Sequence, residues 1–302
     1  GEYLDHLGAL LGVSRLPASH ASCSIRFTLG HFYSYNVNIP AGTKISSGAM
    51  TFATTSDVVI PAGSLSVDAD ASCLTAGSSG NGYVPGQVSR LVEAMAIDVT
   101  AENVTTTSGG SDTESDEAFR ERIQIAPESF SVAGPTKAYE YHARTADADI
   151  IAVAVVGPPD TQPGYVDIYP LMTGGILPSD AVLAKVYEAC NASDIRPDTD
   201  FVSVKKPVVV SYSVDMTYWL NEKDSSAAGL IMSQCESAVE DWVSWQRSAL
   251  GRDINPSELI HRVMSAGGKR VEVRQPVFRE VKAWELGICS GKSVNYGGLE
   301  GA

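Results

Sequence analysis

The chain has 302 residues, of which 44% are hydrophobic and 19% are charged, and its formal net charge is −14. This length exceeds a single ordinary core, so two or three globular domains are expected. The acidic charge repels phosphate backbones, and no segment approaches the roughly 18 apolar residues of a membrane span. We therefore expect neither nucleic acid nor a membrane as a partner.

The cysteines are scattered, odd in number and never spaced as Cys-x-x-Cys: Cys23, Cys73, Cys190, Cys235 and Cys289. This usage argues against a disulfide framework and against a structural zinc site, and it is typical of synthesis in a reducing cytosol. A single Cys23–Cys73 bridge inside the first domain stays open as an alternative.

The chain opens with a predicted helix over residues 3–13, where leucines recur at helical spacing before Gly12. These are Leu4, Leu7, Leu10 and Leu11. The segment lacks the basic start of a secretion signal. It reads as a helix entered part-way, so the natural chain is expected to begin earlier.

Residues 20–107 predict a compact all-β domain. Short β-branched runs such as "CSIRFTL" and "MTFATT" are separated by turn signals, including Pro-Ala-Gly at 40–42 and again at 61–63. Strands at this spacing are typical of a sandwich or a barrel.

The stretch "SGGSDTESDEAFRERI", residues 108–123, holds five acidic and two basic side chains. As a calcium loop starting at Asp112 it fails, because Glu117 replaces the sixth-position glycine and Ile123 replaces the twelfth-position carboxylate. As a catalytic pair, Asp112 and Glu114 have no neighbouring pocket signal. A hydrolase using these two carboxylates is kept only as a rival reading.

The same stretch is better explained as the start of a helix that connects two domains. Gly109 and Gly110 end the β domain, and Ser115 is placed to cap the helix. Asp116 lies at the positive helix end, where we expect it to pair with Arg120 four residues on.

The buried face of this connector helix is expected to carry Phe119 and Ile123, and Pro127 is expected to end the helix. The predicted structural connector motif comprises Gly109, Gly110, Asp112, Glu114, Ser115, Asp116, Arg120 and Arg122.

Residues 108–198 predict the connector helices and a central α+β domain. "GPTKAYEYHARTA" is a helix with Pro135 in its first turn, and "LPSDAVLAKVYEACN" is a helix opened by Ser179 or Asp180. Between them, two strands are expected around a Pro/Gly turn, and the apolar run "IIAVAVVG" is the length of a strand.

Residues 199–290 predict a second α+β domain. After a long β stretch, residues 225–247 form a helix whose apolar stripe indicates a core or interface face. The stripe consists of Ile231, Cys235, Ala238, Trp242 and Trp245. A further helix begins near Pro256 and two strands follow, and the glycine-rich end at 291–302 predicts a flexible tail.

No motif predicts chemistry. "GICSGKS" has three residues between its glycines where a phosphate loop needs four, and "SVKK" lies in a strand pattern without companion motifs. The five histidines show no metal-ligand spacing. The sequence therefore predicts a multi-domain α+β protein, with an N-terminal all-β barrel or sandwich followed by a helical connector and α+β domains. No cofactor, metal or catalytic residue is expected.

The order of these segments resembles the baseplate J-like proteins of contractile phage tails and related injection particles. The matching text covers about residues 3–290 and includes "VNIPAGTKISS", "GSSGNGYVPGQV", "VAGPTKAYEYHA" and "DIRPDTDFVSV". The pattern G-G-x-D-x-E-S-D-E-x-x-R-x-R, from Gly109 to Arg122, is the most specific single element. Family members usually carry a further segment before the point where this sequence starts.

The resemblance implies an assembly protein without an active site, located in the tail baseplate of a virion and made in the cytoplasm of the bacterial host. It implies a wedge subunit, present as paired copies, that joins a sixfold ring around the tail hub. The implied partners are hub proteins, a small wedge protein with a lysozyme-like fold and a wedge protein similar to tail protein I. Rearrangement of such subunits is expected to relay the trigger for sheath contraction.

In this setting the Gly109–Gly110 joint is a candidate hinge between the β domain and the α+β half, because glycine permits hinge dihedrals. Replacing the two glycines with Pro and Val is expected to impair particle assembly or contraction.

The alternative function is that of a carbohydrate-binding or adhesive tail protein. In that interpretation the β domain binds surface sugars, which stack on the aromatic rings of Phe32, Tyr33 and Tyr35. Otherwise these three rings are expected to pack within the strands.

Overall fold

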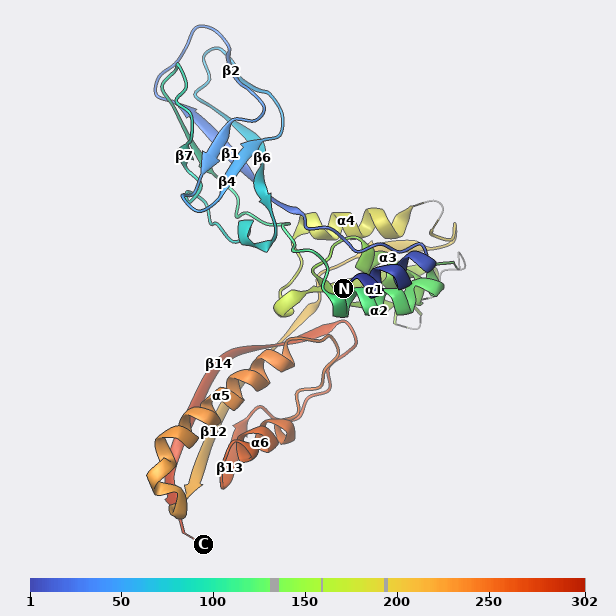
Figure 1. Ribbon diagram of the computed structural model, residues 1–302, viewed down its shortest axis with the longest axis vertical. Helices are drawn as coiled ribbons and strands as arrows, with labels where there is room; N and C mark the ends of the chain where they lie inside the picture. Colours follow the sequence, from blue (N-terminus) through green and yellow to red (C-terminus); the bar gives the residue numbers. More distant parts are fainter. Residues whose placement is uncertain (131–135, 159, 193–194, 302) are drawn as a thin grey trace. The chain divides into compact units, whose positions relative to one another are not determined.

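The computed structural model describes residues 1–130, 136–158, 160–192 and 195–301. It divides into two compact units, and Figure 1 labels many of their helices and strands. The first unit contains Gly1–Pro127 with Thr145–Asp149 and Ser179–Val182, and the second contains Glu128–Arg144, Ile150–Pro178 and Leu183–Ala302.

A six-stranded antiparallel sheet forms the body of the first unit, in the order β7-β3-β4-β6-β1-β8. The outer strands β7 and β8 also approach each other, so the sheet is a nearly closed barrel (Figure 1). Its strands are β1 (His20–Leu29), β3 (Lys44–Ser46), β4 (Thr51–Thr54), β6 (Ser66–Ala76), β7 (Arg90–Leu91) and β8 (Val99–Asn103). A separate pair consists of β2 (Val37–Ile39) and β5 (Val58–Ile60).

The barrel core follows from strict alternation along the strands. In β1, Ile25 and Phe27 are fully buried, and Phe52 of β4 and Ile39 of β2 join the same core. Successive strand residues point to opposite faces, so one set of side chains leaves water together. Burying each such side chain contributes about 1.5–3 kcal/mol.

All five cysteines are free, and Cys23 and Cys73 both belong to the barrel core. Burial, with a smaller contribution from Cys73, raises the pKa of the Cys23 thiol to about 11. The Cys23–Cys73 bridge that the sequence left open is therefore not formed.

The first unit also contains α1 (Glu2–Leu10), a short 3-10 turn η1 (Ser78–Gly80) and α2 (Asp116–Ile125), which runs on into η2 (Ala126–Phe130). The predicted N-terminal helix is present but ends before Gly12. Its leucine stripe lies largely outside the core, since Leu10 is 82% exposed and the buried residue of α1 is Gly8.

A three-stranded sheet lies at the centre of the chain, in the order β11-β10-β9. Its strands are β9 (Ile150–Val156), β10 (Tyr165–Met172) and β11 (Phe201–Val204), with β10 antiparallel to β9 and parallel to β11. The predicted pair of strands around a Pro/Gly turn is thus confirmed. The helices of this region are α3 (Thr136–Thr145), η3 (Thr173–Gly175) and α4 (Asp180–Asn191). Pro135, predicted in the first turn of its helix, lies outside the described residues.

A second three-stranded sheet, in the order β13-β12-β14, is packed on one face by two helices. Alternate residues of β12, including Tyr212, Met216 and Tyr218, are buried with Trp242 of the long helix. The elements are β12 (Val208–Asn221), η4 (Glu222–Ala227), α5 (Ala228–Gln246), α6 (Pro256–Ser265), β13 (Arg270–Gln275) and β14 (Glu285–Glu300).

The predicted helix over 225–247 exists, but it begins as the 3-10 turn η4 and becomes α-helical at Ala228. Its buried face is also rotated from the predicted stripe. Cys235 and Trp242 are buried as expected, together with Val239 and Gln246. Ile231, Ala238 and Trp245 are only half-buried.

The predicted flexible tail at 291–302 is wrong, because residues 291–300 form the second half of β14. This strand pairs in parallel with β12 up to Glu300, opposite Asn221. A Cβ atom on Gly297 would lie 2.3 Å from the ring of Trp219. Glycine at this position therefore permits close packing in a strand, where the sequence had suggested fraying.

The predicted fold class is confirmed: a nearly closed β barrel is followed by helices and further α+β sheets. The division of the chain differs from the predicted boundary at 107/108. Helix α2 belongs to the same unit as the barrel, and the chain first passes to the second unit between Pro127 and Glu128.

Candidate functional site

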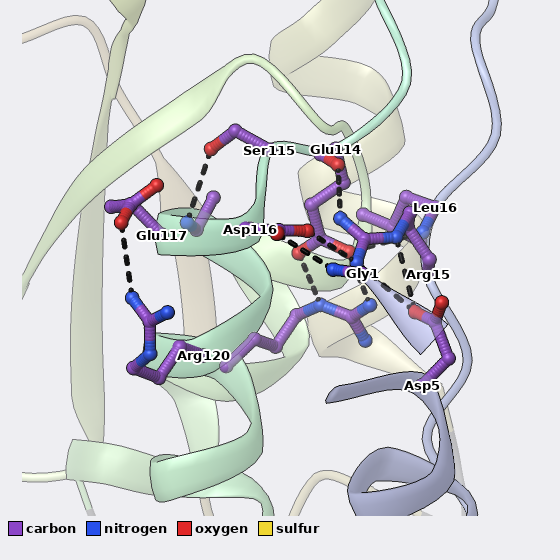
Figure 2. A network of polar contacts seen from close by, with 11 residues as sticks. Gly1, Asp5, Arg15, Leu16, Glu114, Ser115, Asp116, Glu117 and Arg120 are labelled. Carbon is purple, nitrogen blue, oxygen red and sulfur yellow. Dashed lines mark hydrogen bonds and ion pairs between the residues drawn. The ribbon is translucent and has the colours of Figure 1, made fainter. Parts of the chain in front are cut away.

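The predicted connector motif lies where distant segments of the first unit meet. Residues 14–16, here called the strap, run between α1 and the start of α2, and Figure 2 shows the polar contacts around them. Further contacts join residues 77–81 and 108–112 at the base of the barrel. The candidate site is therefore a junction of chain segments.

A buried ion pair between Glu114 and Arg122 forms the centre of the junction. Arg122 donates from Nε to Glu114 Oε1 at 2.8 Å and from Nη2 to Oε2 at 2.6 Å. Both side chains are only 3% exposed. This fork-to-fork geometry fixes the orientation of both groups as well as their separation.

The strap supplies the remaining hydrogen bonds of this ion pair. Glu114 Oε2 accepts from the Leu16 amide at 3.0 Å, and Arg122 Nη2 donates to the Ser14 carbonyl at 2.6 Å. The Glu114 amide in turn donates to the Leu16 carbonyl at 3.1 Å. Burying an ion pair is costly unless such partners are present, and here the main chain of the strap provides them.

Arg15 joins the two helices across the strap. Its Nη2 donates to Asp5 of α1 at 3.0 Å and to Asp116 of α2 at 2.7 Å. Its guanidinium lies 4.8 Å from the centre of the Phe119 ring, and Gly8 lets α1 approach that same ring closely. The arrangement ties α1, the strap and α2 into one body.

The predicted helix cap is confirmed, because the Ser115 side chain accepts from the Ala118 amide at 3.2 Å. The predicted Asp116–Arg120 pair is wrong. Asp116 faces the strap and binds Arg15, whereas Arg120 pairs with Glu117 at 3.1 Å on the exposed side of α2. Because Asp116 binds Arg15, Arg120 pairs instead with Glu117, three residues earlier in the helix.

The expected buried face of α2 also needs correction. Phe119 is fully buried as predicted, but Ile123 is only half-buried, and the second buried residue is Arg122. An arginine occupies this apolar side of the helix because Glu114 neutralises its charge and the Ser14 carbonyl of the strap accepts a further hydrogen bond.

The two glycines of the motif serve different geometric needs. Gly109 has φ +87°, in the left-handed region that favours glycine, and its carbonyl accepts from the Ser19 hydroxyl at 2.9 Å. Gly110 is enclosed: its amide and carbonyl both bond to the Asn81 side chain, at 2.9 and 2.7 Å. A Cβ on Gly110 would lie 2.4 Å from the Gly77 carbonyl oxygen. These contacts describe a clamped joint within one unit, where the sequence had suggested a hinge between domains.

Asp112 completes the attachment of the connector to the barrel. Its carboxylate accepts from the Ser78 amide at 2.9 Å and from the Ser78 hydroxyl at 2.7 Å. These hydrogen bonds hold the pKa of the Asp112 carboxyl below its usual range. Asp112 and Glu114, the pair of the rival hydrolase reading, are thus each engaged in separate structural contacts.

The aromatic residues of the adhesive alternative lie in a loop, and the expectation that all three pack within strands is wrong. Phe32 is 64% and Tyr35 is 56% exposed, whereas Tyr33 packs against the barrel core. The Tyr33 ring contacts His31 at 4.4 Å and Tyr35 at 5.2 Å between centroids.

Several residues of the junction were missed by sequence reasoning. Arg15, Ser19, Ser78 and Asn81 carry no local signal, because their partners in the connector lie between 29 and 101 positions away. Only the polar character of the pattern from Gly109 to Arg122 pointed to this region.

Within the described part of the chain, no three His, Cys, Asp or Glu side chains gather closely enough to hold a metal ion. None of the described helices combines the length and the apolar character needed to cross a membrane.

Comparison with known proteins finds two family models along the chain. The model of the baseplate J-like protein barrel domain matches residues 24–110, and that of the baseplate J-like central domain matches residues 131–206. Baseplate protein J of Escherichia phage P2 is 34% identical over 190 residues, which cover 62% of this chain and 61% of that protein. A chain in the 6-fold symmetrised cryo-EM structure of the anti-feeding prophage baseplate aligns over 93% of this chain and 78% of its own length. That alignment has a TM-score of 0.42 and 12% identity.

Proposed function

Because the chain belongs to the baseplate J-like family, we propose that it is a structural component of the baseplate of a contractile phage tail or tail-like particle. The succession of the barrel-domain and central-domain matches, in that order along one chain, carries the proposal. The protein would be made in the host cytoplasm and reside in the tail baseplate.

Within the baseplate, we assign the chain to the wedge, as paired copies in a ring around the hub. Its neighbours would be hub proteins, a small wedge protein with a lysozyme-like fold and a wedge protein similar to tail protein I. The assignment includes no catalytic role, in keeping with the engagement of Asp112 by Ser78 and of Glu114 by Arg122.

The proposed relay of the contraction trigger draws support from the junction. A relay has to pass on a displacement without absorbing it in a loose joint. Arg15 ties α1 to α2, and the backbones of Ser22 and Ser108 bond to each other at the barrel, at 2.8 and 3.1 Å. A force applied to α1 would reach the barrel through these contacts.

The assembly role is tested with particles from cells in which a tagged copy replaces the native gene. Quantitative mass spectrometry of purified particles is expected to find the chain in a fixed ratio to hub and sheath proteins. A chain recovered only as a free monomer and absent from intact particles would overturn the proposal. The isolated barrel would then be screened on a glycan array to test the adhesive alternative.

The relay role is tested with Arg15→Gln, and with Arg120→Gln as the matched control on the exposed side of α2. We expect Arg15→Gln particles to assemble but to contract less often when triggered, because α1 is uncoupled from α2. Contraction by these particles at the control frequency would refute the relay while leaving the assembly role standing.

A further inference from the structure

One edge of the central sheet is made of apolar residues alone. Strand β9 has the sequence Ile-Ile-Ala-Val-Ala-Val-Val and is the last strand in the order β11-β10-β9. Ile150 and Val156 at its ends are buried, but all five residues between them remain partly exposed. The strand has no charged residue and no proline, and its one register shift lies at the start of the strand, at Ile151. An apolar edge without charge or proline readily pairs with another strand, and proteins usually protect such edges.

The pairing of β10 shows which backbone groups of β9 are free. The Lys205 amide donates to the Ile168 carbonyl at 2.9 Å, so the backbone groups of Ile168 face β11. Backbone groups alternate in direction along a strand, so those of Tyr169 face β9. Tyr169 is opposite Ala154, which therefore directs its own amide and carbonyl toward β10.

The alternation continues along β9. Ala152, opposite Leu171, also directs its backbone groups toward β10. Val153 and Val155 then present their amides and carbonyls to the open edge, and no described residue pairs with that edge. The register shifts at Ile151, where Ala152 is opposite Leu171 and Ile150 is opposite Met172, so the regular alternation covers only this part of the strand. Two donors and two acceptors stand in the pattern that an incoming strand would match.

A groove runs along this same edge. A cavity of about 390 Å³ is lined on one side by β9 residues 152–155 and on the other by Ala249, Leu250, Gly251 and Ala283. Four consecutive strand residues, with side chains on alternating faces, share the cavity, so it follows the edge of β9. Not one of the lining residues has a charged or hydrogen-bonding side chain.

We propose that this groove accepts a β-strand from another polypeptide, which adds a fourth strand to the central sheet beside β9. The strand is uncharged, because a charge placed among these residues would lose its hydration without gaining a partner. Its side chains are alanine or β-branched, since the walls are built from alanine, valine, glycine and leucine. Hydrogen bonds to the open amides and carbonyls of β9 supply the binding affinity. The apolar walls of the groove select which side chains the incoming strand can carry. This binding site does not depend on the baseplate assignment.

The test uses the full chain and a fluorescent peptide with the core Val-Ala-Val-Ala-Val between terminal lysines. Fluorescence anisotropy is expected to show binding, and a peptide with the core Val-Asp-Val-Asp-Val is expected not to bind. Val153→Pro removes one outward amide without removing a bond to β10, and the variant should weaken binding by about tenfold. Val153→Thr keeps the amide and the side-chain shape and is the matched control.

A second measurement covers the case in which the proline variant folds poorly. In the wild-type chain, the peptide should slow amide hydrogen exchange at Val153 and Val155. No binding by the wild-type chain overturns the proposal, as does binding that protects other amides but leaves these two unchanged. Self-association of the chain that Val153→Pro abolishes would make a second copy the occupant, and this too would overturn the assignment to another polypeptide.

Discussion

At the scale of single residues, the junction depends on polar groups that are buried with partners from distant segments. Glu114 and Arg122 form an ion pair, and the main chain of residues 14–16 provides a further hydrogen-bond partner for each side chain. In the barrel, the buried Asn103 side chain accepts from the Val88 amide and donates to carbonyls of the loop at 83–84. Such networks hold loops in one arrangement because each broken bond leaves a buried group unpaired.

Arg122→Ala is expected to lower the free energy of unfolding by about 3–5 kcal/mol, because it leaves the Glu114 carboxylate buried without its counter-charge. Arg120→Ala, two positions earlier in α2, removes an exposed pair and should change stability by less than about 1 kcal/mol. Urea denaturation followed by circular dichroism measures both. Equal effects of the two substitutions would contradict the central place of the buried pair.

The two glycines offer a sharper comparison. Gly110→Ala forces a Cβ against the Gly77 carbonyl and should cost about 2–3 kcal/mol through displaced backbone. Gly109→Ala meets no atom closer than 4.0 Å and should cost only the left-handed strain of about 1–2 kcal/mol. Thermal melting of the two variants gives the ranking. A more damaging Gly109→Ala would mean that the enclosure of Gly110 has little energetic weight.

At this scale, the correct predictions concerned contacts between residues that are close together in the sequence. The Ser115 cap is confirmed because its acceptor and donor lie three residues apart. The Asp116–Arg120 pair is wrong because Arg15, 101 positions away, competes for Asp116, and no spacing rule contains such a partner.

At the scale of elements, periodicity predicted the β barrel, the connector helix and the helix of the last third. Periodicity gave wrong predictions where the structure of a segment depends on its contacts with another segment. The segment 291–300 has glycines at 291, 297 and 298 and no apolar alternation, yet it is a strand because β12 and Trp219 provide its partner and cover. The leucine stripe of α1 has the right spacing, but the short helix buries Gly8 against Phe119 instead.

Deletion of residues 291–302 is expected to unfold or strongly destabilise the last third of the chain. The loss removes half of β14 and uncovers Trp219 and Tyr218, whereas a flexible tail would be dispensable. Deletion of residues 301–302 alone is the matched control. Limited proteolysis with mass spectrometry reports the outcome, and equal resistance of both truncated chains would speak against the pairing of β14.

At the scale of the whole molecule, the barrel and the connector belong to one unit and the remaining sheets to another. The predicted boundary at 107/108 divided the chain where its composition changes. Composition cannot report that Ser19, Ser22, Ser78 and Asn81 bond to residues beyond that point, so the unit extends to Pro127.

A fragment of residues 1–127 is therefore expected to melt at a higher temperature than a fragment of residues 20–107. Loss of two or more of the bonds at the junction should lower the melting temperature by about 10 °C in a domain of this size. Circular dichroism on both fragments measures the difference. Indistinguishable melting would show that the barrel does not need the strap and the connector.

The parallel pairing of β12 with β14 has a consequence for synthesis on the ribosome. Val208 begins β12, but its partner Glu285 is translated only after α5, α6 and β13 are complete. At about 5–20 residues per second, the edge of β12 that pairs with β14 stays open for several seconds. A nascent chain that stalls in this interval exposes that edge to chaperones and proteases. Translation to the end of β14 would thus act as a quality check, passing complete chains and discarding interrupted ones.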